Sequence, residues 1–428
     1  MAPSPSLPYI PFEVIASQIL PKLDVKTLVL CTSIAKQWYS LIKSPSFVCY
    51  HFLHNQRASI FFQICHIERD SLLRRVFRFQ ETYSLYTQNL LLRRPLANPP
   101  FDRFKNNETF FTIVGICKGL VLVIDSNLFS YILWNPSVRK YVLLPRLDQC
   151  LERKACLGFG FANDEDFKVV KLVNVHSSLR QAWVCSFASN SWKSVINNNG
   201  NNINNNDGNN DNNLVGSCYV CEDRSFLCMN GNIIHWIAKR QVGNFYNFVL
   251  TFDLAEEVFG QVPLPEKIRV RSTMSSLSLF ETKGCLAVSN IQNGVVPSPI
   301  VRVWIMKEYG VAESWSKIIK VQIKELIPRN VLALTNNGEM VIEQRGGQIV
   351  KCNPAMATME ELGVGGDKVF GGYLEETLFL LGKGRREDGW REVLVLLRVE
   401  VEQLGNPVLV LLRVEVEQLG NPKREKLR

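Results

Sequence analysis

The chain has 428 residues, of which 46% are hydrophobic and 21% charged, and its mean hydropathy is zero. This composition excludes a globally disordered chain, and the length predicts either one large repetitive domain or a small domain and a larger one. The formal net charge of +9 comes from scattered charges. Because a nucleic-acid groove needs a basic stripe interleaved with aromatic residues, we expect no nucleic-acid partner.

The N-terminus predicts a protein without a secretory signal, since residues 1–11 contain four prolines and no apolar run. No apolar stretch approaches the roughly 20 residues that cross a bilayer, so we expect no membrane partner. The twelve cysteines show no framework spacing, which predicts reduced, buried thiols. These features together favour a location in the cytosol, the nucleus or both.

Three short helical signals open the chain. The first covers residues 12–20, where apolar side chains recur at helical spacing. Asp24 is expected to cap the second helix and Ser33 the third, which we expect to end at Pro45. Three helices in about 45 residues bury little apolar surface alone, so the pattern predicts an apolar face for a partner.

The texture changes after the helices. Residues 51–105 are mixed and basic and predict a connector, whereas 106–407 contain many short β-rich runs separated by turn residues. One tryptophan or other aromatic residue recurs in each unit beside a polar turn. About 300 residues divided by the roughly 50 residues of a kelch-type blade gives about six blades. The predicted fold is therefore mainly β: a small three-helix unit followed by a kelch-like β-propeller.

Two segments stand outside the repeat pattern. Residues 197–213 hold twelve asparagines in seventeen positions, which predicts a surface loop that is dispensable for folding. The sequence VLVLLRVEVEQLGNP occurs twice, at 393–407 and at 408–422. Each copy alternates as a strand does, so we expect one copy to complete the sheet and 408–428 to be a redundant strand with a basic tail.

Residues 7–50 resemble an F-box, with the opening Leu7-Pro8, the run VKTL and the segment KQWYSLIKSPSF. The remainder resembles the plant F-box-associated interaction domain, because GICKGLVLV, LWNPSVRKYVLLP, GFGFANDEDFKVVKLV and LTFDLAEEVFGQVPLP follow in that family's order. Together the two parts resemble the F-box/kelch-like family of plants, which includes the S-locus F-box proteins of pollen.

The resemblance implies a non-catalytic, cofactor-free adaptor of an SCF-type cullin-RING E3 ubiquitin ligase. The F-box would bind the Skp-type subunit and the β domain would bind the target protein. The residues that it implies for adaptor binding are Leu7, Pro8, Ile15, Ile19, Leu20, Leu23, Val25, Leu28 and Trp38. Two alternatives stay open: a propeller that binds a small molecule or glycan, and an oxidase-like propeller enzyme, for which no copper-type ligand set is identified.

Several residues resemble chemical motifs without completing one. Cys218 and Cys221 form a CxxC pair with no second pair at zinc-finger spacing, so buried thiols are the favoured interpretation and no metal is expected. Gly158 and Gly160 lack the third glycine and the helix of a dinucleotide fingerprint. His235 is expected on a strand face beside Trp236.

Three further features have a structural and a functional interpretation. Gly382-Lys383-Gly384 lacks the residues of a phosphate loop, and the acidic run 164–166 is expected to be a solvated turn. The tryptophans at 134, 192, 236, 304 and 315 are expected in the core between blades, although they could line a ligand groove.

Overall fold

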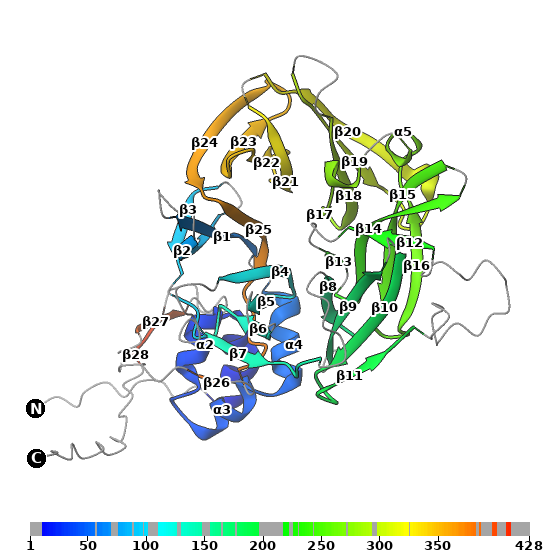
Figure 1. The fold of residues 1–428 in the computed structure, drawn as a ribbon. Helices are drawn as coiled ribbons and strands as arrows, with labels where there is room; N and C mark the ends of the chain where they lie inside the picture. Colours follow the sequence, from blue (N-terminus) through cyan, green and yellow to red (C-terminus); the bar gives the residue numbers. More distant parts are fainter. Residues whose placement is uncertain are drawn as a thin grey trace, which may run out of the picture.

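The fold is described from a computed structural model (Figure 1). It describes residues 11–386, 396–399 and 408–411, apart from 56–57, 70–75, 88–89, 97, 102–109, 126–129, 148–154, 164–165, 176–177, 197–216, 222–225, 230, 243, 271–272, 293–297, 325 and 382–384. The Asn-rich segment 197–213, Leu7, Pro8 and Gly382-Lys383-Gly384 lie outside the described residues. None of the helices in this described part has the length and apolar character that a bilayer crossing requires.

The helices lie together at the start of the chain. They are α1 (Phe12–Val14), followed by a π-helical turn (Ile15–Ile19) and a 3₁₀ turn (Leu20–Lys22), then α2 (Val25–Cys31), α3 (Lys36–Ile42) and α4 (Pro45–His54). The predicted cap of α2 is confirmed, because the Asp24 carboxylate accepts a hydrogen bond from the Thr27 backbone N–H at 2.8 Å. The predicted Ser33 cap is wrong, since α3 begins two residues later, after Ala35.

A fourth helix extends this helical unit (α1–α4) beyond the predicted boundary at residue 50. Pro45, which we expected to end the third helix, occupies the first turn of α4. The Ser44 side chain caps α4 by accepting a hydrogen bond from the Phe47 N–H at 3.3 Å. Serine followed by proline is a common start of a helix, since proline needs no partner for an N–H in the first turn.

The strands form six antiparallel sheets of four or five strands arranged around a ring, which confirms the predicted six-bladed propeller (Figure 1). The first blade consists of β1 (Ala58–Arg69), β2 (Val76–Tyr86) and β3 (Leu92–Pro95) with β25 (Lys368–Glu375), and the second of β4 (Phe111–Cys117), β5 (Leu120–Asp125), β6 (Tyr131–Asn135) and β7 (Lys140–Leu143) with β26 (Arg385–Arg386). The third blade consists of β8 (Cys156–Phe161), β9 (Phe167–Val175), β10 (Ser178–Ser186) and β11 (Ser191–Ser194), and the fourth of β12 (Cys218–Val220), β13 (Leu227–Met229), β14 (Ile233–Val242), β15 (Asn244–Asp253) and β16 (Val258–Pro263). The fifth blade consists of β17 (Leu277–Thr282), β18 (Cys285–Gln292), β19 (Ile300–Met306) and β20 (Trp315–Gln322), and the sixth of β21 (Pro328–Leu334), β22 (Met340–Gln344), β23 (Gln348–Asn353) and β24 (Thr358–Gly365). The short helix α5 (Glu266–Arg269) follows β16.

The ring is closed by a strand from near the end of the described chain. β25 pairs with β1 from Ala58↔Glu375 to Cys65↔Lys368 and also contacts β4 and β21. The inner strands β25, β4, β8, β13, β17 and β21 therefore follow one another around the central axis. Propellers that join an early and a late strand in one blade cannot open without breaking that pairing.

The predicted connector at 51–105 is wrong, since β1, β2 and β3 form most of a blade. β1 is flanked by β2 on one side and by β25 on the other. Consecutive residues Ile60, Phe61 and Phe62 are all buried, because blades pack against both faces of this strand. A strand buried on both faces lacks the two-residue alternation by which strands are recognised in sequences.

The described strands of the duplicated C-terminal segments do not join a blade of the propeller, contrary to the expectation. β27 (Leu396–Val399) in the first copy pairs with β28 (Val408–Leu411) in the second, with Leu396 opposite Leu411. The two copies thus form their own two-stranded sheet. The position that we expected for one of them is taken by β25.

The tryptophans support the blade packing. Trp134, Trp236 and Trp304 are buried, which confirms their expected place in the core. Trp192 and Trp315 are half-buried and bind the neighbouring blade instead. The Trp192 Nε1–H donates to the Pro145 carbonyl at 2.7 Å, and the Trp315 Nε1–H donates to the Pro263 carbonyl at 2.8 Å.

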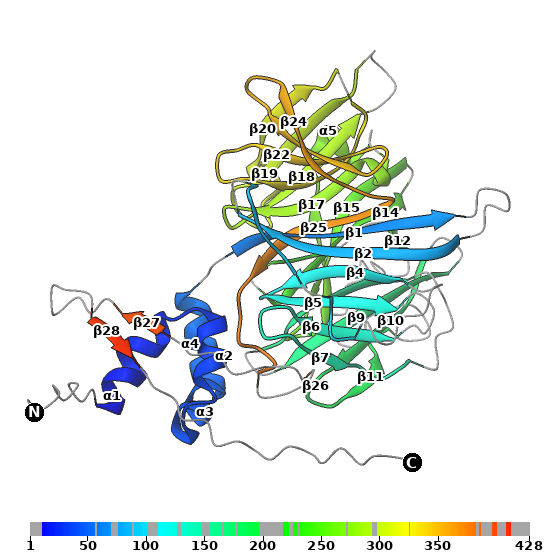
Figure 2. The same ribbon diagram turned by 90° about the vertical axis from the view of Figure 1, so that its left-hand side faces the viewer.

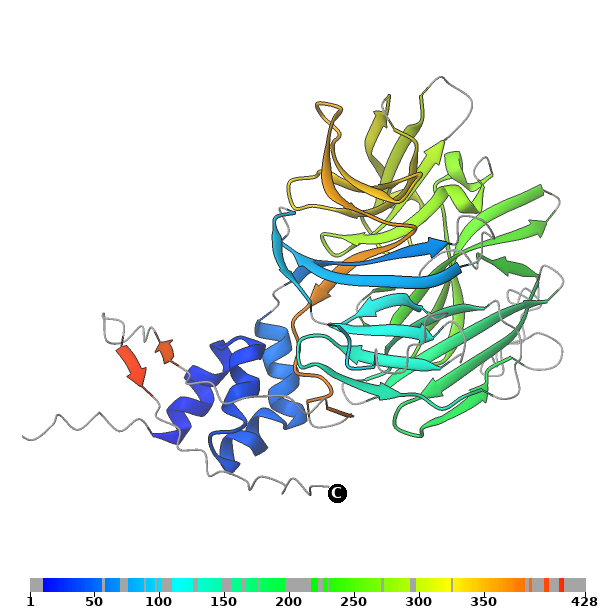
Figure 3. The ribbon, with the colours of Figure 1, turned by 60° about the vertical axis from the view of Figure 1, so that its left-hand side comes forward.

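The helices lie on one side of the propeller, as Figure 2 shows. We call this side the helical face. It carries the end of β25 and the β4–β5 turn, because a Cβ atom on Gly119 would collide with the Glu375 carbonyl oxygen. The chain after β25 continues toward the helices (Figure 3). The opposite side, which carries the β14–β15 turn, is called the far face.

Candidate functional site

The helical unit has a core that continues into the propeller. Its fully buried members include Leu20, Leu28 and Ile42. The same apolar cluster contains Val138, from the turn between β6 and β7, and Leu378 and Leu381, from the segment after β25. Since one cluster is shared, the helical unit and the propeller pack as a single body.

Polar contacts hold this junction in place. The buried Asn135 side chain donates hydrogen bonds to the carbonyl oxygens of Thr377 at 2.9 Å and Phe379 at 2.6 Å. The Lys140 ammonium donates to the Leu381 carbonyl at 2.6 Å. Three carbonyl groups of the segment 377–381 are thus satisfied by side chains of one hairpin, which fixes the surface on which the helices pack.

Asn135 is a residue whose role the sequence did not indicate. Its amide Oδ1 also accepts a hydrogen bond from the Ser137 N–H at 2.8 Å, so it shapes the β6–β7 turn as well. In the sequence, Asn135 stands out only by its position between Trp134 and Pro136. An asparagine there suits a turn, but its bonds to residues more than 240 positions away are visible only in the fold.

The residues implied for adaptor binding divide into two groups. Leu20, Val25, Leu28 and Trp38 are between 0% and 8% exposed, so they form the core of the helical unit rather than its surface. Ile15, Ile19 and Leu23 are partly exposed. Adaptor binding by the described members of the set stays a prediction, and only the second group offers apolar atoms to a partner without rearrangement.

Three exposed apolar side chains of the helical unit are not among the residues that the sequence implied for adaptor binding. Tyr39 and Tyr50 are each 48% exposed, and Leu53 is 62% exposed. The Tyr50 ring stacks on His54 with centroids 4.0 Å apart, and the Lys43 ammonium lies 3.6 Å from the Tyr39 ring centroid. Large exposed apolar side chains on a small unit are typical of a surface that a partner covers.

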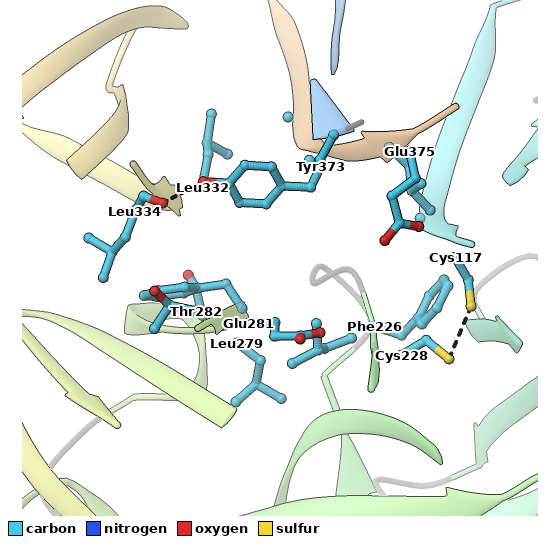
Figure 4. Close-up of a pocket in the computed structure, with 18 of the residues that line it drawn as sticks. Cys117, Phe226, Cys228, Leu279, Glu281, Thr282, Leu332, Leu334, Tyr373 and Glu375 are labelled. Atoms are coloured by element: carbon cyan, nitrogen blue, oxygen red, sulfur yellow. Dashed lines mark hydrogen bonds between the residues drawn. The ribbon is translucent and has the colours of Figure 1, made fainter. Parts of the chain in front are cut away.

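A channel of about 680 Å³ runs along the axis of the propeller. Its walls come from the inner strands, and α4 reaches it with Phe52 and Leu53. The labelled residues in Figure 4 show the mixture of side chains: Cys117, Phe226, Cys228, Leu279, Glu281, Thr282, Leu332, Leu334, Tyr373 and Glu375. A volume of this size lies within the usual range of small-molecule pockets.

The surroundings of the channel raise the pKa of its two carboxyl groups and of one of its thiols. Desolvation raises the pKa of Glu281, and burial raises the pKa of Glu375, which the charge of Glu281 raises further while Lys118 opposes the rise. The Sγ atoms of Cys117 and Cys228 lie 3.4 Å apart. This contact, together with burial, raises the pKa of Cys117 well above its usual value. A protonated thiol is a poor nucleophile, so the arrangement suits binding better than covalent catalysis.

The motif-like residues take structural roles. A Cβ atom on Gly158 would lie 2.6 Å from Cγ2 of Ile234, so this glycine allows close packing of β8 against β14. Burial raises the pKa of Cys218 to about 12, although Arg240 opposes the rise. The Asp166 carboxylate accepts hydrogen bonds from the Ser186 hydroxyl and the Ala188 N–H. Within the described ranges, no three His, Cys, Asp or Glu side chains are grouped as a metal site would need.

His235 is fully buried and neutral. One ring nitrogen, Nδ1, lies 3.2 Å from the Leu227 carbonyl oxygen, which can only accept a hydrogen bond, so Nδ1 carries the proton. Nε2 then accepts from the Tyr309 hydroxyl at 2.8 Å. Burial lowers the pKa of His235 to about 4. The expected position beside Trp236 on a strand is confirmed, and the ring serves as a hydrogen-bonded core residue.

Comparison with known proteins places this architecture in a family. F-box protein CPR1 of Arabidopsis thaliana is 27% identical over 331 residues, which cover 73% of each chain. F-box protein At4g22390 of the same plant is 25% identical over 324 residues, covering 72% of each chain. The family profile described as "F-box associated beta propeller domain" matches residues 88–371, more than half of the chain. The chain therefore belongs to the family of plant F-box proteins that carry an F-box associated β-propeller domain.

Proposed function

We propose that the protein is the substrate-recognition adaptor of an SCF-type cullin-RING E3 ubiquitin ligase, without catalytic activity of its own. The helical unit binds a Skp-type subunit and the propeller holds the target. The observation that carries this proposal is the shared core of the two parts, which includes Leu28, Val138 and Leu378. A rigid connection holds a bound target at a fixed position near the ligase, where its effective concentration is high.

The partly exposed side chains of the helical unit provide the test. Replacing Ile15 and Ile19 by serine removes apolar atoms from partly exposed positions and leaves the fully buried Leu20 and Leu28 unchanged. Because Ile15 also packs against the core of the helical unit, the melting temperature of the variant is measured alongside. Co-purification of a Skp-type subunit should fall at least about tenfold. The matched control is Met356→Ser, which changes a 73% exposed side chain of the propeller. Unchanged co-purification of the subunit with the double variant would show that this surface is not the adaptor site.

Reconstituted ubiquitination tests the second half of the proposal. Target modification should require the Skp-type subunit, the cullin and the RING protein together, and should fall with the Ile15 and Ile19 variant. Deletion of residues 1–55 is unsuitable, because it would expose Val138, Leu378 and Leu381 of the shared core. Modification of a target by the chain alone would contradict a non-catalytic role.

A second candidate function is supported by the channel. A small molecule or glycan bound beside Glu281, Glu375 and Tyr373 would couple ligand recognition to the helical unit, because α4 reaches the same channel. Calorimetry with a panel of metabolites and oligosaccharides, compared with a Glu375→Gln variant, tests this function. We also propose a cytosolic or nuclear location, which a fluorescent fusion would reveal.

A further inference from the structure

The far end of the β14–β15 hairpin carries three cations that lie on aromatic rings, and we call this group the cationic rim. It consists of Lys239, Arg240, Arg269, Tyr219, Phe245, Tyr246 and Phe248. The Lys239 ammonium lies 5.1 Å from the ring centroid of Tyr219 and 5.5 Å from that of Phe245. The Arg269 guanidinium, at the end of α5, lies 4.5 Å from the Tyr246 ring. Figure 1 shows β14, β15 and α5 in the same part of the ring.

The cationic rim lies on the far face of the propeller. β14 begins beside the helical face, because a Cβ atom on Gly231, just before this strand, would collide with Lys118 of the β4–β5 turn. Lys239 and Arg240 come near the other end of this ten-residue strand. At about 3.3 Å per residue, Lys239 lies about 20 Å and Arg240 about 23 Å from its start. The rim therefore remains accessible when a partner covers the helices.

The cations of the rim have no acidic counterpart among the described residues. Elsewhere in the propeller cations are paired: Lys168 and Lys193 both bind the Glu257 carboxylate, at 2.8 and 2.7 Å. No described carboxylate forms such an ion pair with Lys239, Arg240 or Arg269. Arg240 and Tyr246 are paired across the hairpin and share one of its faces, whereas Lys239 and Phe245 lie on the other face. Positive charges on both faces of the hairpin end, without a carboxylate among the described residues, favour an anionic partner that wraps around this end.

Arg240 shows which hydrogen bonds are missing. Its Nε and Nη2 atoms are shielded from solvent and have no hydrogen-bond partner in the described structure. These two nitrogens form the edge of the guanidinium that a carboxylate binds with two parallel hydrogen bonds. Leaving a buried donor unsatisfied is costly, and a carboxylate that displaces the covering side chains would remove this cost.

The rim also exposes apolar surface beside its charges. Phe245 is 56% exposed, and Val270, the residue after Arg269, is 57% exposed. A single-stranded nucleic acid would need a longer basic groove that follows its backbone. Cations restricted to one hairpin end, next to two exposed apolar side chains, fit a short protein segment that combines carboxylates with apolar residues.

We propose that the cationic rim is the docking surface for an acidic segment of the target protein. Carboxylates of that segment accept hydrogen bonds from Arg240 and Arg269, and its apolar side chains cover Phe245. The inference rests on the proposed adaptor function and specifies the chemistry of the target. A target bound here occupies the face opposite to the helical unit.

The test uses the full chain and two labelled probe peptides. One peptide alternates glutamate with phenylalanine, and the other alternates lysine with phenylalanine. The acidic peptide should bind at least about tenfold more tightly than the basic one, and Arg240→Gln with Arg269→Gln should remove at least about tenfold of that affinity. The single variants Arg269→Gln and Lys239→Gln should each weaken binding and keep the melting temperature, which covers the case in which the double variant folds poorly.

A charge-matched control distinguishes binding at the cationic rim from attraction by the net positive charge of the whole protein. Lys317→Gln with Lys320→Gln removes two exposed charges from β20, in another blade, and should change the affinity by less than about twofold. Equal losses in the control and rim variants, or equal binding of both peptides, would overturn the proposal. Tighter binding of a single-stranded oligonucleotide at the rim would assign it to nucleic acid instead. Capture of the Skp-type subunit, measured on the same samples, reports separately on the adaptor function.

Discussion

The ring of Phe52 in α4 and the ring of Phe379, in the segment after β25, lie 5.6 Å apart at an interplanar angle of 52°. This contact joins the helical unit to the propeller at the mouth of the channel, which Phe52 also lines. Phe379 in turn contacts Phe161 of β8, with centroids 5.0 Å apart. Through Phe379 the helical unit is therefore connected to a blade of the propeller, and its contacts are not limited to the segment after β25.

Removing this contact should loosen the helical unit. Phe52 is 6% exposed, so Phe52→Ala should lower the free energy of unfolding by about 3–5 kcal/mol. Urea denaturation gives the free energy, and hydrogen exchange should show the loss of protection in α2–α4. The control Met356→Ala, at a 73% exposed side chain, should stay within about 0.5 kcal/mol of the wild type. A Phe52→Ala protein that matches the control would show that the contact is not structural.

The C-terminal boundary of the fold lies between β25 and the duplicated segments. Truncation after Arg386 keeps all six blades and should leave the melting temperature within a few degrees, because among the described strands β27 and β28 pair with each other and not with a blade. Truncation after Asp367 removes β25 and should prevent folding, since β1 and β4 lose a neighbour. Light scattering and circular dichroism distinguish the two results. A folded monomer after the second truncation would contradict closure by β25.

His235 should make the protein sensitive to mild acid. Its pKa is about 4 in the folded state and about 6.5 in the unfolded state, because burial disfavours the charged ring. Above about pH 6.5 both states hold a neutral imidazole, and His235 contributes nothing to the pH dependence. Between about pH 6.5 and 4 the unfolded chain takes up a proton that the folded chain does not. The free energy of unfolding should therefore fall, by on the order of 3 kcal/mol in total.

A non-titrating variant isolates this effect. His235→Gln keeps a donor and an acceptor for the Leu227 carbonyl and the Tyr309 hydroxyl. The stability of the wild type relative to the variant, measured by urea denaturation, should decrease steadily from about pH 6.5 to about pH 4 and then level off. Parallel pH profiles for the two proteins would show that His235 titrates normally in the folded state.

A side chain at position 158 should destabilise the protein. A Cβ atom there would lie 2.6 Å from Cγ2 of Ile234 and 2.7 Å from Cζ2 of Trp236, so Gly158→Ala should cost about 1–3 kcal/mol by overpacking. The control is Gly372→Ala, whose new Cβ would meet its nearest atoms at an ordinary 3.4 Å. Thermal denaturation of both variants checks the difference. Equal stabilities would mean that β8 and β14 can separate at little cost.

The sequence indicates the blades well where a local signal exists. The apolar runs and the recurring aromatic residues predict strands and core positions, as for Trp134 and Trp236. β1 is not predicted, because burial on both faces removes the alternation of apolar and polar residues, and its partner β25 lies about 300 residues away. The helical unit shows a different limit. Apolar residues at helical spacing indicate a face, but the pattern alone cannot distinguish a side chain that is buried, such as Leu28, from one that stays partly exposed, such as Ile19.

The pairing of β1 with β25 also means that the propeller cannot close until most of the chain has been synthesised. Ile67 and Asp367, which are hydrogen-bonded across the end of this pairing, are separated by 300 positions in the chain. At roughly 5–20 residues per second, the ribosome needs roughly 15–60 s to make the second strand after the first. Throughout that interval the apolar β1 has one open edge, which is a template for aggregation. We therefore expect the nascent chain to need protection from aggregation until translation is nearly complete, and a chain that ends before β25 to remain an open ring with an unpaired strand edge.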